Sequence, residues 1–160
     1  MQAASLHELK KELQVLPPAQ LAELCVALAK YKKENKEFLA YLLFQSHDKD
    51  AFVKDVKLEI DELFTELGAQ GNLYHAKKSL RKILRLINRY CKYLADKGLA
   101  AELHIYFCLK LKDSGIRFRK SQLLLNMYEQ ELKKIHTLVA ALHEDLQGDY
   151  TNDLEAINRY

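Results

Sequence analysis

The sequence contains few of the residues that interrupt helices. It has only five glycines and two prolines among 160 residues, and Pro17 and Pro18 are adjacent. Glycine and proline mark most turns and loops, so their scarcity favours long helices over a meander of short strands. The sequence also lacks a glycine-rich phosphate-binding loop and a G-x-S-x-G nucleophile motif, which removes the simplest signatures of nucleotide hydrolysis and acyl transfer.

Long apolar runs are missing as well. The closest approach to an uncharged apolar window, residues 38–47, has about half the length that a transmembrane helix needs, so we expect no membrane span. The N-terminal segment is charged from the start and does not resemble a signal peptide. An odd number of cysteines, Cys25, Cys91 and Cys108, lie within helical patterns. Reduced thiols and a cytoplasmic location are therefore expected.

The composition is that of an ordinary globular protein, with 49% apolar and 29% charged residues. Apolar residues recur at spacings of three and four, which is typical of amphipathic helices. We expect an all-α fold: a single domain of residues 1–160, with about seven or eight helices that short loops pack as antiparallel hairpins. The expected helices are 6–16, 18–32, 35–43, 48–68, 72–98, 99–113, 121–147 and one that begins near 151.

Local signals support several of these boundaries. Ser5 and Glu8 have the spacing of a capping box, and Pro18 suits the first turn of the next helix. We expect Leu21, Leu24, Leu28 and Tyr31 to face inward from that helix. The very apolar run 103–109 contains β-forming residues, but its helical neighbours favour a central helix over a strand.

The order of three segments resembles that of uncharacterised bacterial helical domains of unknown function. These segments are EFLAYLL (Glu37–Leu43), AKKSLRKILRLINRY (Ala76–Tyr90) and AAELHIYFCLKLKDSGIRF (Ala100–Phe118). The resemblance lies in the layout of the segments. It implies a bacterial cytoplasmic protein with an all-helical fold, and it assigns no functional residue.

Metal-binding patterns are incomplete. His104 and Cys108 are four residues apart on one helix face, and His136 and His143 are seven apart beside Glu144. Neither pair has the further ligands of a tetrahedral site or the HExxH pattern. We therefore predict no metal site and no cofactor.

Catalytic patterns are equally weak. Ser46, His47 and Asp48 are adjacent in the sequence, whereas a catalytic triad is assembled in space from side chains that point at one another. These residues are better explained as a loop and a helix cap. We predict no catalytic residue, no small-molecule substrate and no enzymatic activity.

The segment 72–98 stands out because of its charge. It carries eight positive residues and one acid, Asp96, which gives a net charge of +7 within a chain of +3, so the remaining residues sum to −4. Its apolar residues occupy one arc of a helix, and its cations occupy nearly the opposite arc. Like charges at i,i+4, such as Arg81 and Arg85, are each unfavourable by roughly 0.2–0.5 kcal/mol. A surface helix normally avoids this arrangement.

The cationic face is the candidate binding site. It comprises Lys78, Arg81, Lys82, Arg85, Arg89, Lys92 and, at its border, Tyr93. We expect it to bind an acidic protein partner or a second copy of this chain. The alternative is sequence-independent nucleic-acid binding, in which the cations follow a phosphate backbone and Tyr93 stacks on a base.

Internal neutralisation is a further alternative. The preceding helix carries an acidic stripe made of Asp55, Glu59, Glu62 and Glu66. An antiparallel turn would bring this stripe beside the flanks of the basic helix. It would not easily reach Lys78, Arg85 and Arg89, which point away from the expected core.

Overall fold

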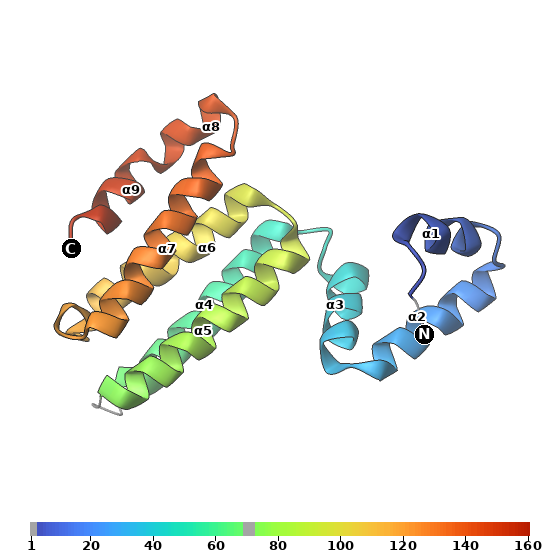
Figure 1. Ribbon diagram of the computed structural model, residues 1–160, viewed down its shortest axis with the longest axis horizontal. Helices are drawn as coiled ribbons and strands as arrows, with labels where there is room; N and C mark the ends of the chain where they lie inside the picture. Colours follow the sequence, from blue (N-terminus) through green and yellow to red (C-terminus); the bar gives the residue numbers. More distant parts are fainter. Residues whose placement is uncertain (1–2, 69–72) are drawn as a thin grey trace. The chain divides into compact units, whose positions relative to one another are not determined.

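The computed structural model describes residues 3–68 and 73–160. These residues form eight α-helices of eight or more residues, the four-residue helix α8 and two short 3-10 helices, with no β-strand among them (Figure 1). The predicted all-α fold is confirmed, including the helical state of the run 103–109. The predicted turn at 69–71 and Asn72 lie outside the described residues. None of the described helices is long and apolar enough to cross a membrane.

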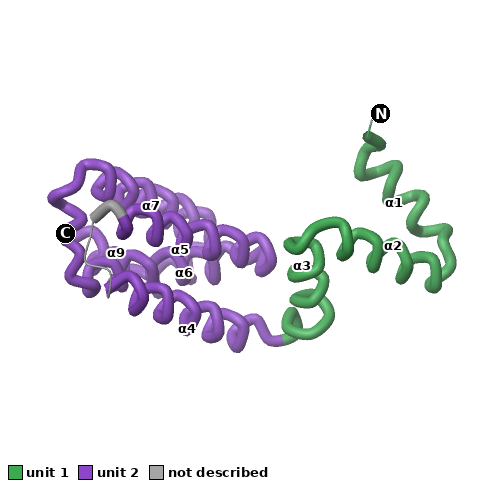
Figure 2. The backbone as a smooth tube through the Cα atoms, turned by 90° about the horizontal axis from the view of Figure 1, so that it is seen from below, with its two compact units in different colours: residues 1–47 green, residues 48–160 purple. Residues whose placement is uncertain are grey.

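The contacts divide the chain into two compact units (Figure 2). The N-terminal unit comprises Met1–His47, and the C-terminal unit comprises Asp48–Tyr160. From the sequence we expect one domain of residues 1–160.

The N-terminal unit contains α1 (Leu6–Gln14), α2 (Pro18–Tyr31) and α3 (Lys33–Phe44). The predicted capping box is present: the Glu8 amide donates to Ser5 Oγ at 3.3 Å, and the Ser5 amide donates to the Glu8 carboxylate at 2.7 Å. The Ser5 amide and hydroxyl both donate hydrogen bonds to the Glu8 carboxylate, and these two bonds lower the pKa of that carboxyl. Pro18 occupies the first turn of α2, as predicted.

The apolar face of α2 differs from the prediction. Leu24, Leu28 and Tyr31 are exposed rather than buried. Helix α2 packs against α3, and the Asn35 side chain of α3 donates to the Leu28 carbonyl at 2.8 Å. The periodicity identified an apolar face correctly, but periodicity contains no information about what covers that face.

The C-terminal unit is a helical bundle centred on α6. Its elements are α4 (Lys49–Gly68), α5 (Leu73–Leu94), α6 (Lys97–Asp113), η1 (Phe118–Lys120), α7 (Gln122–Ala140), α8 (Glu144–Gln147), η2 (Gly148–Tyr150) and α9 (Thr151–Asn158). Helix α6 packs against α4, α5, α7 and α9. Helices α4 to α7 lie side by side in Figure 1. The central position of α6 agrees with its very apolar sequence.

The core of this unit is formed by the inward faces of α4 to α7. Ile60, Leu80, Ile83, Phe107 and Ile135 are fully buried. The predicted apolar arc of the basic helix contributes to this core, whereas its cations lie on the opposite face. Burial of the arc therefore fixes which face of α5 is presented to solvent.

Two helix ends lie four or more residues from their predicted positions. Helix α5 ends at Leu94 rather than at Gly98, because Ala95 adopts a left-handed conformation with φ of 47° and Asp96 caps α6. The Asp96 carboxylate accepts a hydrogen bond from the Leu99 amide at 3.0 Å. Helix α7 ends at Ala140 rather than at Gln147, and α8 starts separately with His143 as its N-cap.

Candidate functional site

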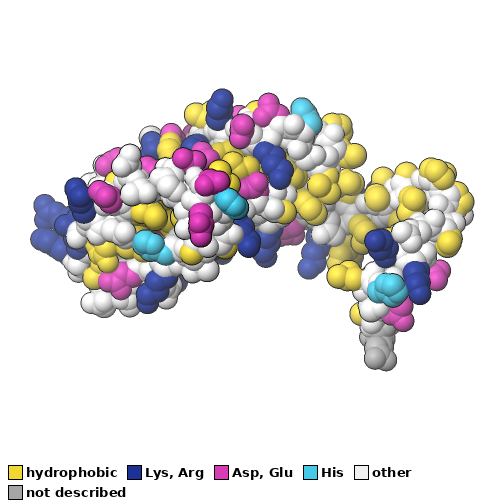
Figure 3. Space-filling model, turned by 90° about the horizontal axis from the view of Figure 1, so that it is seen from above, with side chains coloured by type: hydrophobic (Ala, Val, Ile, Leu, Met, Phe, Trp, Pro, Cys, Tyr) yellow, Lys and Arg dark blue, Asp and Glu magenta, His cyan; other side chains and the backbone are white. Residues whose placement is uncertain are grey.

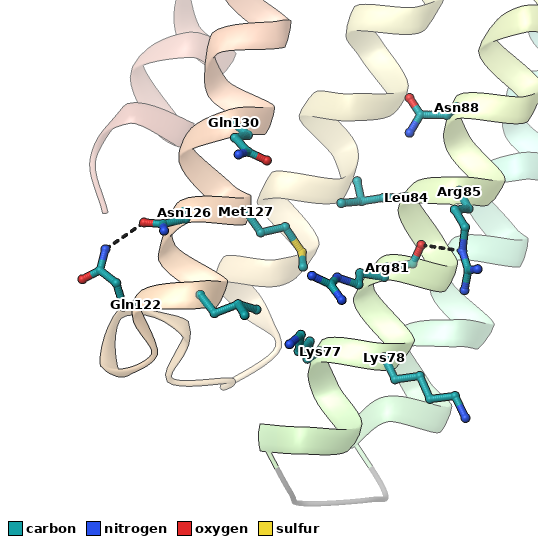
Figure 4. A pocket seen from close by; sticks show the side chains of 11 residues that line it. Lys77, Lys78, Arg81, Leu84, Arg85, Asn88, Gln122, Asn126, Met127 and Gln130 are labelled. Atoms are coloured by element: carbon teal, nitrogen blue, oxygen red, sulfur yellow. Dashed lines mark hydrogen bonds between the residues drawn. The ribbon is translucent and has the colours of Figure 1, made fainter.

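A groove of about 950 Å³ lies between α5 and α7 (Figure 4). Both helices pack on α6, and their labelled residues ascend in the same direction along the groove. The α5 wall consists of Lys77, Lys78, Arg81, Leu84, Arg85 and Asn88. The α7 wall consists of Gln122, Leu123, Asn126, Met127 and Gln130. We call this feature the α5–α7 groove.

The α5 wall is cationic because of helical geometry. Lys77, Arg81 and Asn88 follow one another at intervals of about one or two turns, so they lie along one edge of the helix. A rise of about 1.5 Å per residue gives about 16 Å between Lys77 and Asn88. Of the described residues, four cations and no carboxylate line the groove. The lining is therefore an uninterrupted positive strip.

These cations are not neutralised within the described residues. Lys77, Lys78, Arg81, Lys82 and Arg85 form no ion pair with any of them. Arg85 Nε donates to the Arg81 carbonyl at 3.3 Å, a contact along the same helix that leaves its charge uncompensated. The positive strip is thus available to a negatively charged ligand.

The acidic stripe of α4 does not pair with these groove cations. Glu59 accepts a hydrogen bond from the Tyr90 hydroxyl at 2.9 Å. Among the described residues, Asp55, Glu62 and Glu66 form no ion pair. Internal neutralisation of Lys78 and Arg85 by this stripe is therefore not found.

Among the described residues, the ion pairs of α4 are instead made with α6. Lys57 pairs with Glu102 at 2.6 Å, and Asp61 pairs with Lys110 at 2.8 Å. The Tyr106 hydroxyl also donates to Asp61. The hydrogen bond to Asp61 raises the pKa of Lys110. These contacts fasten α4 to the central helix and involve no residue of the groove lining.

The α7 wall supplies neutral polar groups and part of an apolar floor. Gln122, Asn126 and Gln130 are spaced by four residues, and Gln122 Nε2 donates to Asn126 Oδ1 at 2.7 Å. Met127 and Leu123 add apolar surface opposite the buried Leu84 of α5. Figure 4 shows Met127 and Arg81 extending toward each other across the groove.

Only some residues of the cationic face predicted from the sequence line the groove. Lys78, Arg81 and Arg85 line the groove, whereas Lys82, Arg89, Lys92 and Tyr93 do not. The Arg89 guanidinium lies 5.1 Å from the centre of the Tyr90 ring. Tyr93 packs edge to face on Tyr90, with ring centres 5.7 Å apart. Tyr93 thus lies within an aromatic cluster rather than beside the groove cations.

Sequence reasoning missed Lys77 and the whole α7 wall. The available signal was the spacing of Gln122, Asn126 and Gln130, which places three amides on one face of a helix. Amides are common on solvated faces, so this spacing alone does not identify a site. Their pairing with α5 depends on the packing of both helices on α6.

The histidine and cysteine side chains of the core have structural rather than chemical roles. His104 Nδ1 lies 2.6 Å from Glu131 Oε2 in the core. Burial raises the pKa of the Cys108 thiol, and it raises that of Cys91 to about 11. The described residues contain no group of three or more His, Cys, Asp or Glu side chains that could hold a metal ion. The groove therefore offers charge and shape rather than a nucleophile or an acid–base pair.

Comparisons with protein-family models, with curated proteins and with solved structures find no match to this chain.

Proposed function

We propose that this protein is a non-enzymatic cytoplasmic interaction protein whose α5–α7 groove binds an acidic segment of a protein partner. The observation that carries the proposal is the set of groove cations without ion pairs, lined up opposite a wall of amides. The proposal takes Lys78, Arg81 and Arg85 from the predicted face and adds Lys77 from the structure.

Charge favours an anionic ligand. Lys77 and Arg81, like Arg81 and Arg85, are like-charge neighbours one turn apart on α5, and each pair is unfavourable by roughly 0.2–0.5 kcal/mol. Carboxylates placed among these cations relieve the repulsion and form charge-assisted hydrogen bonds. The absence of a carboxylate from the groove lining means that no internal acid competes with the ligand.

The opposite wall favours a polypeptide among anionic ligands. The amides of Gln122, Asn126 and Gln130 can both donate to and accept from a peptide backbone. Leu84, Leu123 and Met127 offer apolar surface to side chains between the carboxylates, and methionine adapts to varied partners. A phosphate backbone only accepts hydrogen bonds, so it can use the N–H groups of these amides but not their oxygens. It also gains little from the apolar surface.

Nucleic-acid binding is the second candidate. The row of cations over about 16 Å of helix matches the requirement for phosphate contacts. The packing of Tyr93 against Tyr90, away from the groove, removes the stacking residue that the sequence suggested. The acidic protein segment is therefore preferred.

Fluorescence anisotropy at low salt tests the proposal. The probes are a labelled peptide of alternating Glu and Leu residues and a labelled single-stranded oligothymidylate. We expect the peptide to bind, and the double variant Arg81→Glu, Arg85→Glu to bind it roughly tenfold more weakly, because two exposed charge contacts become repulsive.

The matched control is Lys54→Glu, Lys97→Glu, which makes the same change in net charge at exposed positions outside the groove. It is expected to retain peptide binding within about twofold, because distant exposed charges are screened. Equal losses in both double variants would reject the groove. Binding of the oligothymidylate but not of the peptide would replace the first candidate by the second.

A further inference from the structure

The N-terminal unit leaves most of its apolar surface exposed. Within its described residues, Tyr41 is the only buried residue. Twelve of the fifteen exposed large hydrophobic side chains of the described residues belong to this unit. Figure 3 shows many yellow hydrophobic side chains on the surface of the molecule. A helical unit of this size with one buried side chain lacks a core of its own.

The exposed side chains form stripes rather than isolated patches. Leu6, Leu9 and Leu13 recur at spacings of three and four on α1, and Leu24, Leu28 and Tyr31 do so on α2. This spacing is typical of a helix face that is buried against another element. Apolar stripes exposed on two consecutive helices are the kind of surface that marks an interaction site.

We propose that these stripes of α1 and α2 bind the same stripes of a second copy of this chain. The twelve exposed large hydrophobic side chains of the unit, which include the six of the stripes, are 38–85% exposed, so burying them on a partner approaches the roughly 800 Å² per partner of a standard protein interface. The stripes contain no charge, so a twofold axis that pairs each stripe with its own copy brings no like charges together. This inference is independent of the α5–α7 groove.

The charge of the unit favours a second copy over a membrane. Residues 1–47 contain six lysines and five glutamates, with no arginine or aspartate. Because the two signs are nearly balanced, two copies do not repel each other strongly. Amphipathic helices that bind lipid surfaces usually carry an excess of basic residues on the polar face, and this unit has almost none. A dimer formed here carries two α5–α7 grooves and can bind a repeated ligand with avidity.

Light scattering of the full chain after size exclusion tests the inference. At micromolar concentration we expect the wild type to have twice the chain mass of 18.6 kDa. Leu28→Glu is expected to reduce this to the mass of one chain. The Leu28 side chain is already 62% exposed, so the change should leave helical circular dichroism unaltered.

Leu58→Glu is the matched control, because Leu58 on α4 is also 62% exposed but lies in the other unit. It should retain the mass of two chains. If Leu28→Glu loses helix, Leu6→Glu tests the same face at a position that is 85% exposed. A wild type with the mass of one chain would overturn the inference, as would a two-chain mass in both stripe variants. A one-chain wild type that sediments with phosphatidylcholine vesicles would also overturn it, in favour of a lipid surface.

Discussion

Lys134 on α7 donates a hydrogen bond to the side-chain oxygen of Asn88 on α5. Asn88 lies at the end of the groove remote from Lys77 (Figure 4). The bond directly joins two helices that each pack on α6. It therefore sets the separation of the groove walls at that end.

Asn88→Ala should lower the free energy of unfolding by about 1 kcal/mol, because the half-buried Lys134 ammonium loses its acceptor. Urea denaturation followed by circular dichroism measures this change. Asn126→Ala is the control, since the Asn126 amide is exposed and its hydrogen bond with Gln122 lies along α7 alone. Its effect should stay within about 0.5 kcal/mol. Equal effects of the two variants would show that the bond to Lys134 adds no stability.

Loss of the buried contact between His104 and Glu131 should lower the free energy of unfolding more than Asn88→Ala does. The two side chains lie 2.6 Å apart between α6 and α7, and both residues are buried. His104 Nε2 has no hydrogen-bond partner among the described residues. Glu131→Ala removes the only hydrogen-bond partner that this ring has among the described residues and leaves a void, so the free energy of unfolding should fall by about 3 kcal/mol.

An exposed ion pair provides the comparison for Glu131→Ala. Glu155 pairs with Arg159 at 3.1 Å on the surface of α9, and Glu155→Ala should cost less than about 1 kcal/mol. Combining Glu131→Leu with His104→Leu should recover much of the loss, because apolar side chains of similar volume replace buried polar ones. A double variant as unstable as Glu131→Ala would argue that packing, rather than polarity, dominates this site.

The three thiols should differ strongly in reactivity. Cys25 is exposed, whereas Cys91 is half-buried and Cys108 is buried. Burial raises the pKa of Cys91 to about 11 and that of Cys108 as well, so both stay protonated and unreactive at neutral pH. Ellman's reagent should therefore titrate one fast thiol in the native protein. Cys25→Ser should abolish this phase, while urea should expose the two slow thiols; two fast thiols in the native wild type would contradict the structure.

Periodicity predicted the elements of this fold better than their ends and partners. The run 103–109 could be assigned to a helix because the segments around it are helical. The end of α5 could not be predicted, because Ala95 adopts a left-handed conformation, which glycine favours and alanine does not. The sequence therefore predicts the end of the helix at the next glycine, Gly98.

Burial and the candidate site depended on tertiary contacts that the sequence does not contain. The pattern of Leu24, Leu28 and Tyr31 indicates an apolar face, but it does not distinguish a core from an exposed stripe. Half of the groove was predictable, because the cations of α5 share one helix face. The amides of α7 were not, since they come together with α5 only through α6.

We propose that an acidic polypeptide binds in the α5–α7 groove. Photo-cross-linking locates such a ligand directly. The probe is the peptide of alternating Glu and Leu residues with one Leu replaced by benzoylphenylalanine, which reacts readily with methionine. Met127 lies in the groove and is one of only two methionines in the chain. We predict that mass spectrometry of the digest finds the peptide attached to the segment that contains Met127, and that Arg81→Glu, Arg85→Glu removes this product. Attachment elsewhere, or at Met127 with equal yield in the double variant, would contradict the account.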